Sequence, residues 1–365
     1  MVNLANVALN SYVFKKEPIS LIHFVTNKCN ARCKHCFIDF DHPDAFKGEL
    51  TLEEIDKLTR SFGRSLLNVN LTGGEPFLRK DFFEIARLYF QNADVRSIYI
   101  TTNGMFTKLT KDFLDKFVAS GIKGNIILSF SVDNFEDGHD ENRRVKGLYR
   151  NTLNTYNLAK GYNKPNIMAN ISITVTDHNY DKVIELYHYL KNENGVDAFT
   201  AIAMREEGVI KKIDPTIKKK IYDAYVKLTS LIKEDMLNNK IEGYKKEGIQ
   251  GTLLNSKNMI MYKNIADSYM HPKYISHCPA GVLFGVIWAN GMVYPCEILN
   301  KPLGNLRDYS MNFMELWKNE QTKNVKKFIK DTNCNCTFEC AWAINIISNK
   351  RYIPSLIANS IRQKI

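Results

Sequence analysis

The chain has 365 residues, of which 44% are apolar and 24% are charged, and its formal net charge is +11. This length allows one large α/β domain and a smaller second domain, and the apolar content is ordinary for a globular protein. The sequence contains no run of about 18 apolar residues and no basic-then-apolar N-terminal segment, which argues against a membrane span and a secretory signal, so we expect a cytoplasmic protein.

Short runs rich in β-branched and aromatic residues alternate with segments of helical periodicity between residues 21 and 204. The predicted strands are residues 21–26, 67–71, 97–102, 125–132, 167–175 and 198–204. The predicted helices are residues 52–62, 81–90, 111–120, 149–160 and 180–192, and Thr51 with Glu54 fits a capping box before the first of them. Strict alternation predicts a parallel sheet, either doubly wound or curled into a barrel, with its active site at the carboxyl ends of the strands.

The remainder of the chain has a different pattern. Residues 215–264 are lysine-rich and helical in period, glycines interrupt short apolar runs after residue 277 as in a small hairpin, and a helix is predicted near residues 311–330. We therefore predict an N-terminal extension (1–18), an α/β core (19–208), a helical connecting segment (209–275), a small cysteine-rich domain (276–345) and a C-terminal tail (346–365).

The eight cysteines fall into two groups, which favours metal binding over disulfides in a chain without an export signal. Cys29, Cys33 and Cys36 follow the first predicted strand, and five more lie between residues 278 and 340. Three thiolates on one short loop can bind three irons of a four-iron cluster, and the missing fourth ligand leaves one iron open. The alternative is a zinc site completed by one histidine out of His23, His35 and His42.

A second motif, Thr72-Gly73-Gly74-Glu75-Pro76, directly follows the second predicted strand. Its glycines let a ligand approach the backbone closely, and Glu75 offers acceptors for an ammonium group. Together with the C-x-x-x-C-x-x-C loop, this motif resembles the radical S-adenosylmethionine (radical SAM) superfamily over about residues 19–205. The resemblance implies a partial (β/α)6 TIM-like barrel, a SAM-binding [4Fe-4S] cluster on Cys29, Cys33 and Cys36, and reductive cleavage of SAM to a 5′-deoxyadenosyl radical that abstracts hydrogen from a substrate.

The resemblance also implies a set of SAM-binding residues at successive strand ends. The Gly-Gly-Glu turn would hold the SAM amino group, His35 would lie beside the adenine, and Arg143 would meet the SAM carboxylate. The complete expected set is His35, Gly73, Gly74, Glu75, Thr102, Asn103, Ser131, Asp133 and Arg143. Taken singly, each also has an ordinary structural interpretation, such as a turn asparagine, a packed ring or a surface arginine.

The C-terminal cysteines resemble the SPASM/twitch extensions of radical SAM enzymes, which hold auxiliary [4Fe-4S] clusters. They are Cys278, Cys296, Cys334, Cys336 and Cys340. Because five cysteines are too few for two clusters, we expect one auxiliary [4Fe-4S] cluster, with Cys334 as the weakest candidate ligand. A structural zinc ribbon and a buried unliganded cysteine are the alternatives.

The prediction for function is a radical SAM enzyme that oxidises a small carbohydrate-like metabolite. The alternative is a peptide-modifying enzyme (a RiPP or protein maturase), whose peptide another chain would deliver because the residues before the first strand are too few for a peptide-recognition domain. The sequence identifies no catalytic residue. Several charged residues are possible members of the barrel mouth, although surface charge is the default interpretation of each: Asp39, Asp41, Arg205, Glu206 and Glu297.

The positive net charge permits an acidic protein, an anionic substrate or a nucleic acid as partner. We expect flavodoxin or ferredoxin as electron donor, because a basic surface favours their approach, and a small-molecule or peptide substrate without a membrane partner. A zinc-containing nucleic-acid-binding protein is a distant alternative, since the cysteines fit no common finger spacing and the basic residues are dispersed. An electron carrier with closed clusters is a third hypothesis.

Overall fold

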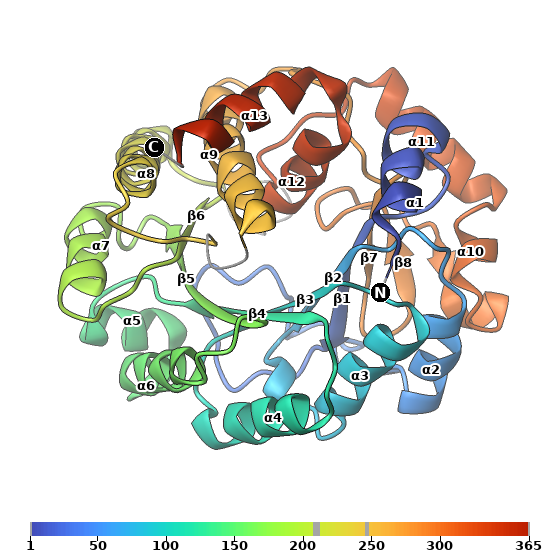
Figure 1. Cartoon of the computed structure of the whole chain (residues 1–365), viewed down its shortest axis with the longest axis horizontal. Coiled ribbons are helices and arrows are strands. Elements are labelled where there is room, and N and C mark those ends of the chain that lie inside the picture. The colour runs from blue at the N-terminus through green and yellow to red at the C-terminus, as the bar shows by residue number, and fades with distance from the viewer. Residues whose placement is uncertain (1, 207–211, 245–247, 364–365) are drawn as a thin grey trace.

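The computed structural model describes residues 2–206, 212–244 and 248–363. Its centre is a nine-stranded sheet in the order β6-β5-β4-β3-β2-β1-β7-β8-β9 (Figure 1). The strands are β1 (Ser20–Thr26), β2 (Asn68–Gly73), β3 (Ser97–Thr102), β4 (Asn125–Ser131), β5 (Ile167–Val175), β6 (Phe199–Ala203), β7 (Phe284–Ile287), β8 (Met292–Tyr294) and β9 (Gly304–Asn305). All six predicted strands are present, and neighbours among β1 to β6 are parallel, which confirms the TIM-like α/β core.

Helices surround the strands and bury the apolar faces that their periodicity predicts. The helices that alternate with the first six strands are α2 (Leu52–Arg60), α3 (Phe82–Asn92), α4 (Thr107–Ala119), α5 (Glu136–Arg143), α6 (Leu148–Gly161) and α7 (Val183–Asn192). The capping box of α2 is confirmed, because Thr51 Oγ1 accepts from the Glu54 N–H and Glu54 Oε2 accepts from the Thr51 N–H. Helix α5 has no counterpart among the predicted helices.

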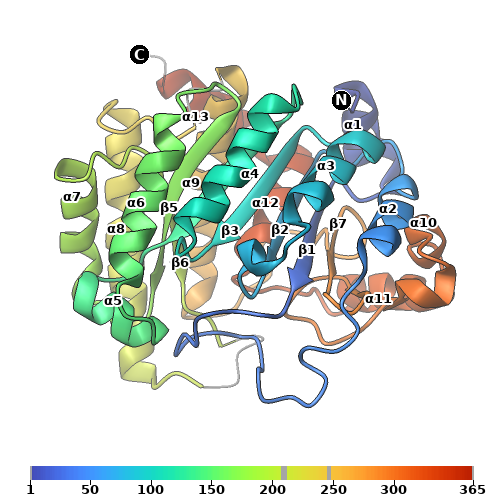
Figure 2. The same cartoon turned by 90° about the horizontal axis from the view of Figure 1, so that it is seen from below.

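The C-terminal part contains the predicted hairpin, but it also extends the barrel sheet. Strands β7 and β8 pair antiparallel, whereas β7 runs parallel to β1, with Ser20 opposite Phe284 and His23 opposite Ile287. The last domain therefore shares the sheet of the core. Figure 2 shows that the loop between β1 and α2 projects beyond the carboxyl end of the sheet.

The segments outside the core are mainly helical. They contain α1 (Leu4–Leu9), a π-helical turn (Asn10–Phe14), α8 (Pro215–Leu237), α9 (Ile249–Tyr269), α10 (Phe313–Leu316), α11 (Glu320–Asp331), α12 (Glu339–Ser348) and α13 (Ile353–Arg362), with short 3-10 turns at Leu306–Tyr309 and Lys350–Tyr352. A further 3-10 turn, Pro76–Leu78, follows β2 within the core. The expected boundary between residues 208 and 209 lies outside the described residues, and the domain limits stay predictions. Among the described helices, none combines the length and the apolar character that crossing a membrane requires.

Candidate functional site

The three N-terminal cysteines lie on the loop after β1, with partly buried, free thiols. Burial raises the pKa of each thiol, that of Cys29 to about 11, so the thiolates need compensating positive charge such as bound iron. In the described ranges no three His, Cys, Asp or Glu side chains converge as ligands of a single metal ion. A four-iron cluster does not require such convergence, because each thiolate binds a different iron. The loop therefore fits the expected cluster.

The end of α5 holds this loop by backbone hydrogen bonds. The Arg32 N–H donates to the Arg143 carbonyl (3.1 Å), and the Lys34 N–H donates to the Asn142 carbonyl (3.0 Å). This pairing brings Nη1 of Arg143 to 3.8 Å from Sγ of Cys33. The unpredicted helix thus places a cationic side chain beside a candidate iron ligand.

The two glycines of the Gly-Gly-Glu turn allow it to pack against the end of β1. A Cβ atom on Gly73, whose φ is +146°, would lie 2.0 Å from the Thr26 carbonyl oxygen, and one on Gly74 would lie 2.2 Å from that of Lys28. The N–H groups of Gly74 and Glu75 donate to the same carbonyls of Thr26 and Lys28, each at 2.8 Å. The turn and the start of the cysteine loop are therefore locked together.

The Glu75 side chain is fully buried, and the chain itself supplies its hydrogen-bond donors. Its carboxylate accepts from the Phe77 N–H (3.1 Å), the Asn103 N–H (2.8 Å) and Thr102 Oγ1 (2.9 Å). Burial raises the pKa of Glu75 to about 7, although these hydrogen bonds oppose the shift. These hydrogen bonds join the turn to the end of β3, and the binding of an ammonium group by Glu75 stays a prediction.

Asn103 links the end of β3 to the cysteine loop. Its Nδ2 donates to Oδ1 of Asn30 (2.9 Å) and lies 4.0 Å from Sγ of Cys29. Asn30 was not among the predicted site residues, and only its position beside Cys29 could have indicated it.

Asp133 organises the end of β4. Its Oδ2 accepts from Nη2 (2.6 Å) and Nε (3.1 Å) of Arg143 and lies 3.8 Å from Nε2 of His35. Burial alone would raise the pKa of Asp133, but Arg143, with smaller contributions from His35 and His139, lowers it to about 2. Asn142, which the sequence did not single out, contacts Nδ1 of His35 at 3.1 Å. An ionised, paired carboxylate thus fixes the orientation of Arg143, and Asn142 is the hydrogen-bond partner of His35.

The expected SAM-binding residues consequently gather around the cysteine loop at the carboxyl ends of β2 to β4. Ser131 lies on β4 opposite Ser172, without a described side-chain partner of its own. Three aromatic rings cover one side of the loop: Phe37 follows Cys36, and its ring lies 6.4 Å from that of Trp288, which stacks on Phe24 at 4.2 Å. Trp288 comes from the turn between β7 and β8, so the C-terminal domain contributes a ring to this aromatic cluster.

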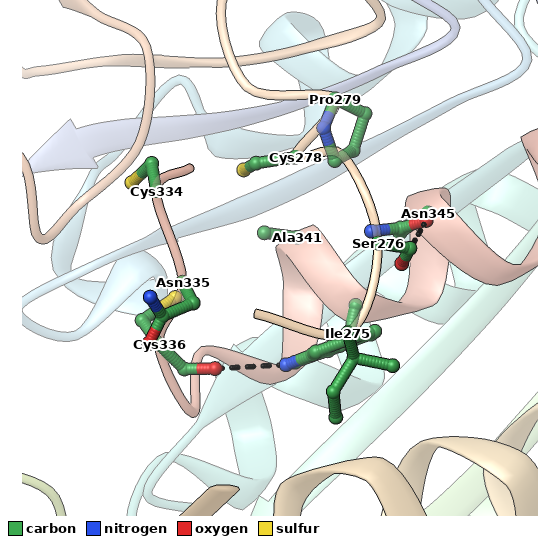
Figure 3. Close-up of a pocket in the computed structure, with 10 residues that line it drawn as sticks. Ile275, Ser276, Cys278, Pro279, Cys334, Asn335, Cys336, Ala341 and Asn345 are labelled. Carbon is green, nitrogen blue, oxygen red and sulfur yellow. Dashed lines mark hydrogen bonds between the residues drawn. The ribbon is translucent and has the colours of Figure 1, made fainter. Parts of the chain in front are cut away.

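Three cysteines of the second group, Cys278, Cys334 and Cys336, line a cavity in the C-terminal domain (Figure 3). The neighbouring Cys334 thiol contributes to a raised pKa of Cys278, and Cys278 lowers the pKa of Cys334 to about 7. Cys296 is buried, and its Sγ accepts from the Leu299 N–H at 3.3 Å. Cys334, the weakest candidate by sequence, therefore lines the same cavity as two other predicted ligands.

Cys340 has a different environment, at the start of α12. Burial, together with Glu297 and Glu339, raises the pKa of its thiol, while Arg205 and Lys257 act in the opposite direction. Arg205 and Glu297 are not surface charges, contrary to the default interpretation, because they form a buried ion pair with a 2.9 Å contact. Glu206 pairs with Lys218 at a more exposed position.

Comparison with known proteins identifies two regions. Residues 24–190 match the model of the radical SAM superfamily, and residues 278–341 match that of the SPASM iron-sulfur cluster-binding domain. The AdoMet-dependent heme synthase of Methanosarcina barkeri is 27% identical over 312 residues, or 81% of each chain. The sporulation killing factor maturation protein SkfB of Bacillus subtilis is 25% identical over 309 residues, which cover 83% of this chain and 65% of SkfB.

Solved structures share the whole fold at low sequence identity. The structure of native anSMEcpe with bound AdoMet and the Kp18Cys peptide has a TM-score of 0.59 and 20% identity, covering 95% of this chain and all of that one. Streptococcus suis SuiB bound to its precursor peptide SuiA has a TM-score of 0.60 and 18% identity, covering 92% and 74%. Other matches are local: the GTP 3′,8-cyclase of Yersinia pestis is 41% identical over 83 residues, a quarter of its length.

Proposed function

The chain belongs to the radical SAM superfamily and carries a C-terminal SPASM domain, and we propose that its substrate is a peptide. It is a radical enzyme that uses SAM and [4Fe-4S] clusters. The observation that carries this proposal is the match to the SkfB maturation protein over 83% of the chain. The shared fold of two peptide-bound structures supports it. Peptide modification thereby replaces carbohydrate oxidation as the leading hypothesis.

The residues around the first cysteine loop would hold the cofactors as follows. Cys29, Cys33 and Cys36 would bind three irons, and the turn at Gly73 and Gly74 would present its backbone to SAM. When bound, the cluster supplies the electron that cleaves SAM to a 5′-deoxyadenosyl radical, which takes hydrogen from the substrate.

The protein's own contribution is positioning and the exclusion of water. Asp133 holds Arg143 so that its Nη1 faces Cys33, where a guanidinium can receive an anionic group of SAM. Glu75 keeps the ends of β2 and β3 in register, and the Phe37–Trp288 contact covers the loop.

For the auxiliary cluster we propose four ligands. Cys278, Cys334 and Cys336 line one cavity, and the charge of Cys334 acts on Cys296, which supports these four as the ligand set. The fifth, Cys340, would lie beside this set. Iron and sulfide analysis of anaerobically purified single Cys→Ser variants tests the assignment, because loss of about four irons is expected for each ligand and none for Cys340.

A second candidate, synthesis of a heme, is favoured by one observation: the heme synthase match covers 81% of both chains. Deuterium transfer discriminates between the candidates. A cell extract grown on deuterated medium is divided into a peptide fraction and a small-molecule fraction, and each is incubated with dithionite-reduced enzyme and unlabelled SAM.

We expect deuterium in 5′-deoxyadenosine with the peptide fraction and its loss after protease digestion of that fraction. The Cys33→Ser enzyme, which should lack the SAM-binding cluster, is the blank. Transfer only from the small-molecule fraction would reject a peptide substrate, and formation of heme in that fraction would establish the second candidate.

The electron donor is proposed to be flavodoxin or ferredoxin. Lys28 and Lys47, near the cysteine loop, are well exposed and can attract an acidic surface. We expect Lys28→Glu/Lys47→Glu to slow cluster reduction by flavodoxin at low salt, whereas Lys263→Glu on α9 should not. If reduction by flavodoxin is equally fast in all three proteins and insensitive to salt, this docking surface is wrong.

A further inference from the structure

Arg205 lies two residues beyond the end of β6, and its buried guanidinium forms ion pairs with two glutamates. Its Nη1 contacts Oε2 of Glu339 at 3.0 Å, and its Nη2 contacts Oε2 of Glu297 at 2.9 Å. The side chains of the three residues are only 14%, 9% and 10% exposed, respectively. The guanidinium carbon also lies 4.7 Å from the centre of the Phe338 ring.

Each glutamate is adjacent in sequence to a cysteine of the C-terminal group. Glu297 follows Cys296, and Glu339 precedes Cys340. One guanidinium therefore joins the rim of the barrel to two of the cysteine-bearing segments of the SPASM domain. Lys257, on α9, adds a second positive charge on the Cys340 side.

Stability alone is a weak explanation for this arrangement. Buried ion pairs gain little over well-packed apolar groups of similar volume, because the charges must be desolvated. Charges close to an iron-sulfur cluster, however, change its reduction potential, and rigid neighbours fix the positions of its ligands.

We propose that Arg205 is a positioning residue for the auxiliary cluster. Its guanidinium holds the Cys296 and Cys340 segments against the barrel and offsets the negative charge of Glu297 and Glu339 near the cluster. This inference rests on the proposed function insofar as it requires an auxiliary cluster. Without the guanidinium, the positive charge beside these two buried carboxylates would be lost, and the oxidised cluster, which carries more positive charge than the reduced one, would be favoured.

The test is a redox titration of the iron-loaded protein followed by electron paramagnetic resonance. In Arg205→Met we expect at least a tenfold fall in the ratio of reduced to oxidised auxiliary cluster at a fixed potential, which corresponds to about 59 mV for a one-electron couple. Arg205→Met/Glu297→Gln/Glu339→Gln, which removes all three charges, should restore the ratio at least to the wild-type value. Arg150→Met, at an exposed ion pair with Glu136, is the matched control and should titrate as the wild type.

If Arg205→Met does not retain its iron, Arg205→Lys provides the test. Lysine keeps the positive charge but cannot contact both glutamates through two separate nitrogens. A near-wild-type potential with an altered resonance spectrum would support the proposal. An unchanged potential in Arg205→Met, or an unchanged spectrum in Arg205→Lys when the methionine variant cannot be loaded, would overturn it. Wild-type protein with about four irons rather than about eight would instead reject the auxiliary cluster, and with it that part of the proposed function.

Discussion

Because Gly74 has no Cβ atom, the Gly-Gly-Glu turn can pack closely against the start of the cysteine loop. Gly74→Ala should destabilise the chain by about 1–3 kcal/mol and reduce its iron content, because the new Cβ would meet the Lys28 carbonyl at 2.2 Å and neither backbone segment can move freely. Urea unfolding of the iron-free protein and iron analysis measure both effects.

Gly161, at the end of α6, is the matched control. No atom lies within 4 Å of a Cβ placed there, so Gly161→Ala should stabilise the chain by up to about 1 kcal/mol. Equal behaviour of the two variants would show that the turn does not require close approach.

Arg143 and Asp133 form the most deeply buried ion pair of the first site. Arg143→Met should cost about 3–5 kcal/mol of unfolding free energy, because it leaves the Asp133 carboxylate buried and uncompensated. Arg143→Met/Asp133→Asn should recover part of this loss. Denaturant unfolding measures both, and a loss no larger than that of the exposed variant Arg150→Met would mean that water compensates Asp133.

At the scale of elements, β1 carries a buried histidine that makes stability depend on pH. Burial, with a smaller effect of Arg79, lowers the pKa of His23 to about 3, and its Nδ1 lies 2.9 Å from the Tyr89 hydroxyl. The unfolded chain, with an ordinary pKa near 6.5, binds more protons between about pH 3 and 6.5, so stability falls as the pH falls through this window.

His23→Gln should therefore reduce the loss of unfolding free energy between pH 7 and pH 5 by about 2 kcal/mol. His271→Gln, at an exposed position, should leave the pH dependence unchanged. Parallel pH profiles for the wild type and His23→Gln would contradict the buried neutral state of His23.

The sequence was sufficient for those elements whose local signals agree with their packing. The six strands and the α2 capping box were predicted because alternation and side-chain capping act within a few residues. Helix α5 was not, because Glu136–Arg143 lacks an apolar stripe and is held by the cysteine loop. Likewise, Cys29, Gly73 and Glu75 belong to short motifs, whereas Arg205, Glu297 and Glu339 meet only through the fold and were undetectable as a unit.

At the scale of the whole molecule, the parallel pairing of β7 with β1 makes one sheet of the two domains. Backbone amides of β7 should thus exchange with deuterated solvent almost as slowly as those of β1, since opening β7 uncovers the buried edge of the barrel. Native-state hydrogen exchange measures this directly, with the exposed face of α13 as the fast reference. Rapid exchange of β7 beside a protected β1 would show that the SPASM domain opens independently.

The same pairing has a consequence for biosynthesis. Strand β1 leaves the ribosome early, but its second neighbour follows roughly 260 residues later, which at about 5–20 residues per second is a delay of some 13–50 seconds. During that interval β7 is not yet available to pair with β1, so one edge of β1, with the thiol loop at its end, stays unpaired. Chaperones and the cluster-assembly machinery should consequently meet the N-terminal thiols before the barrel has closed, and slow translation or premature termination would leave an aggregation-prone edge exposed.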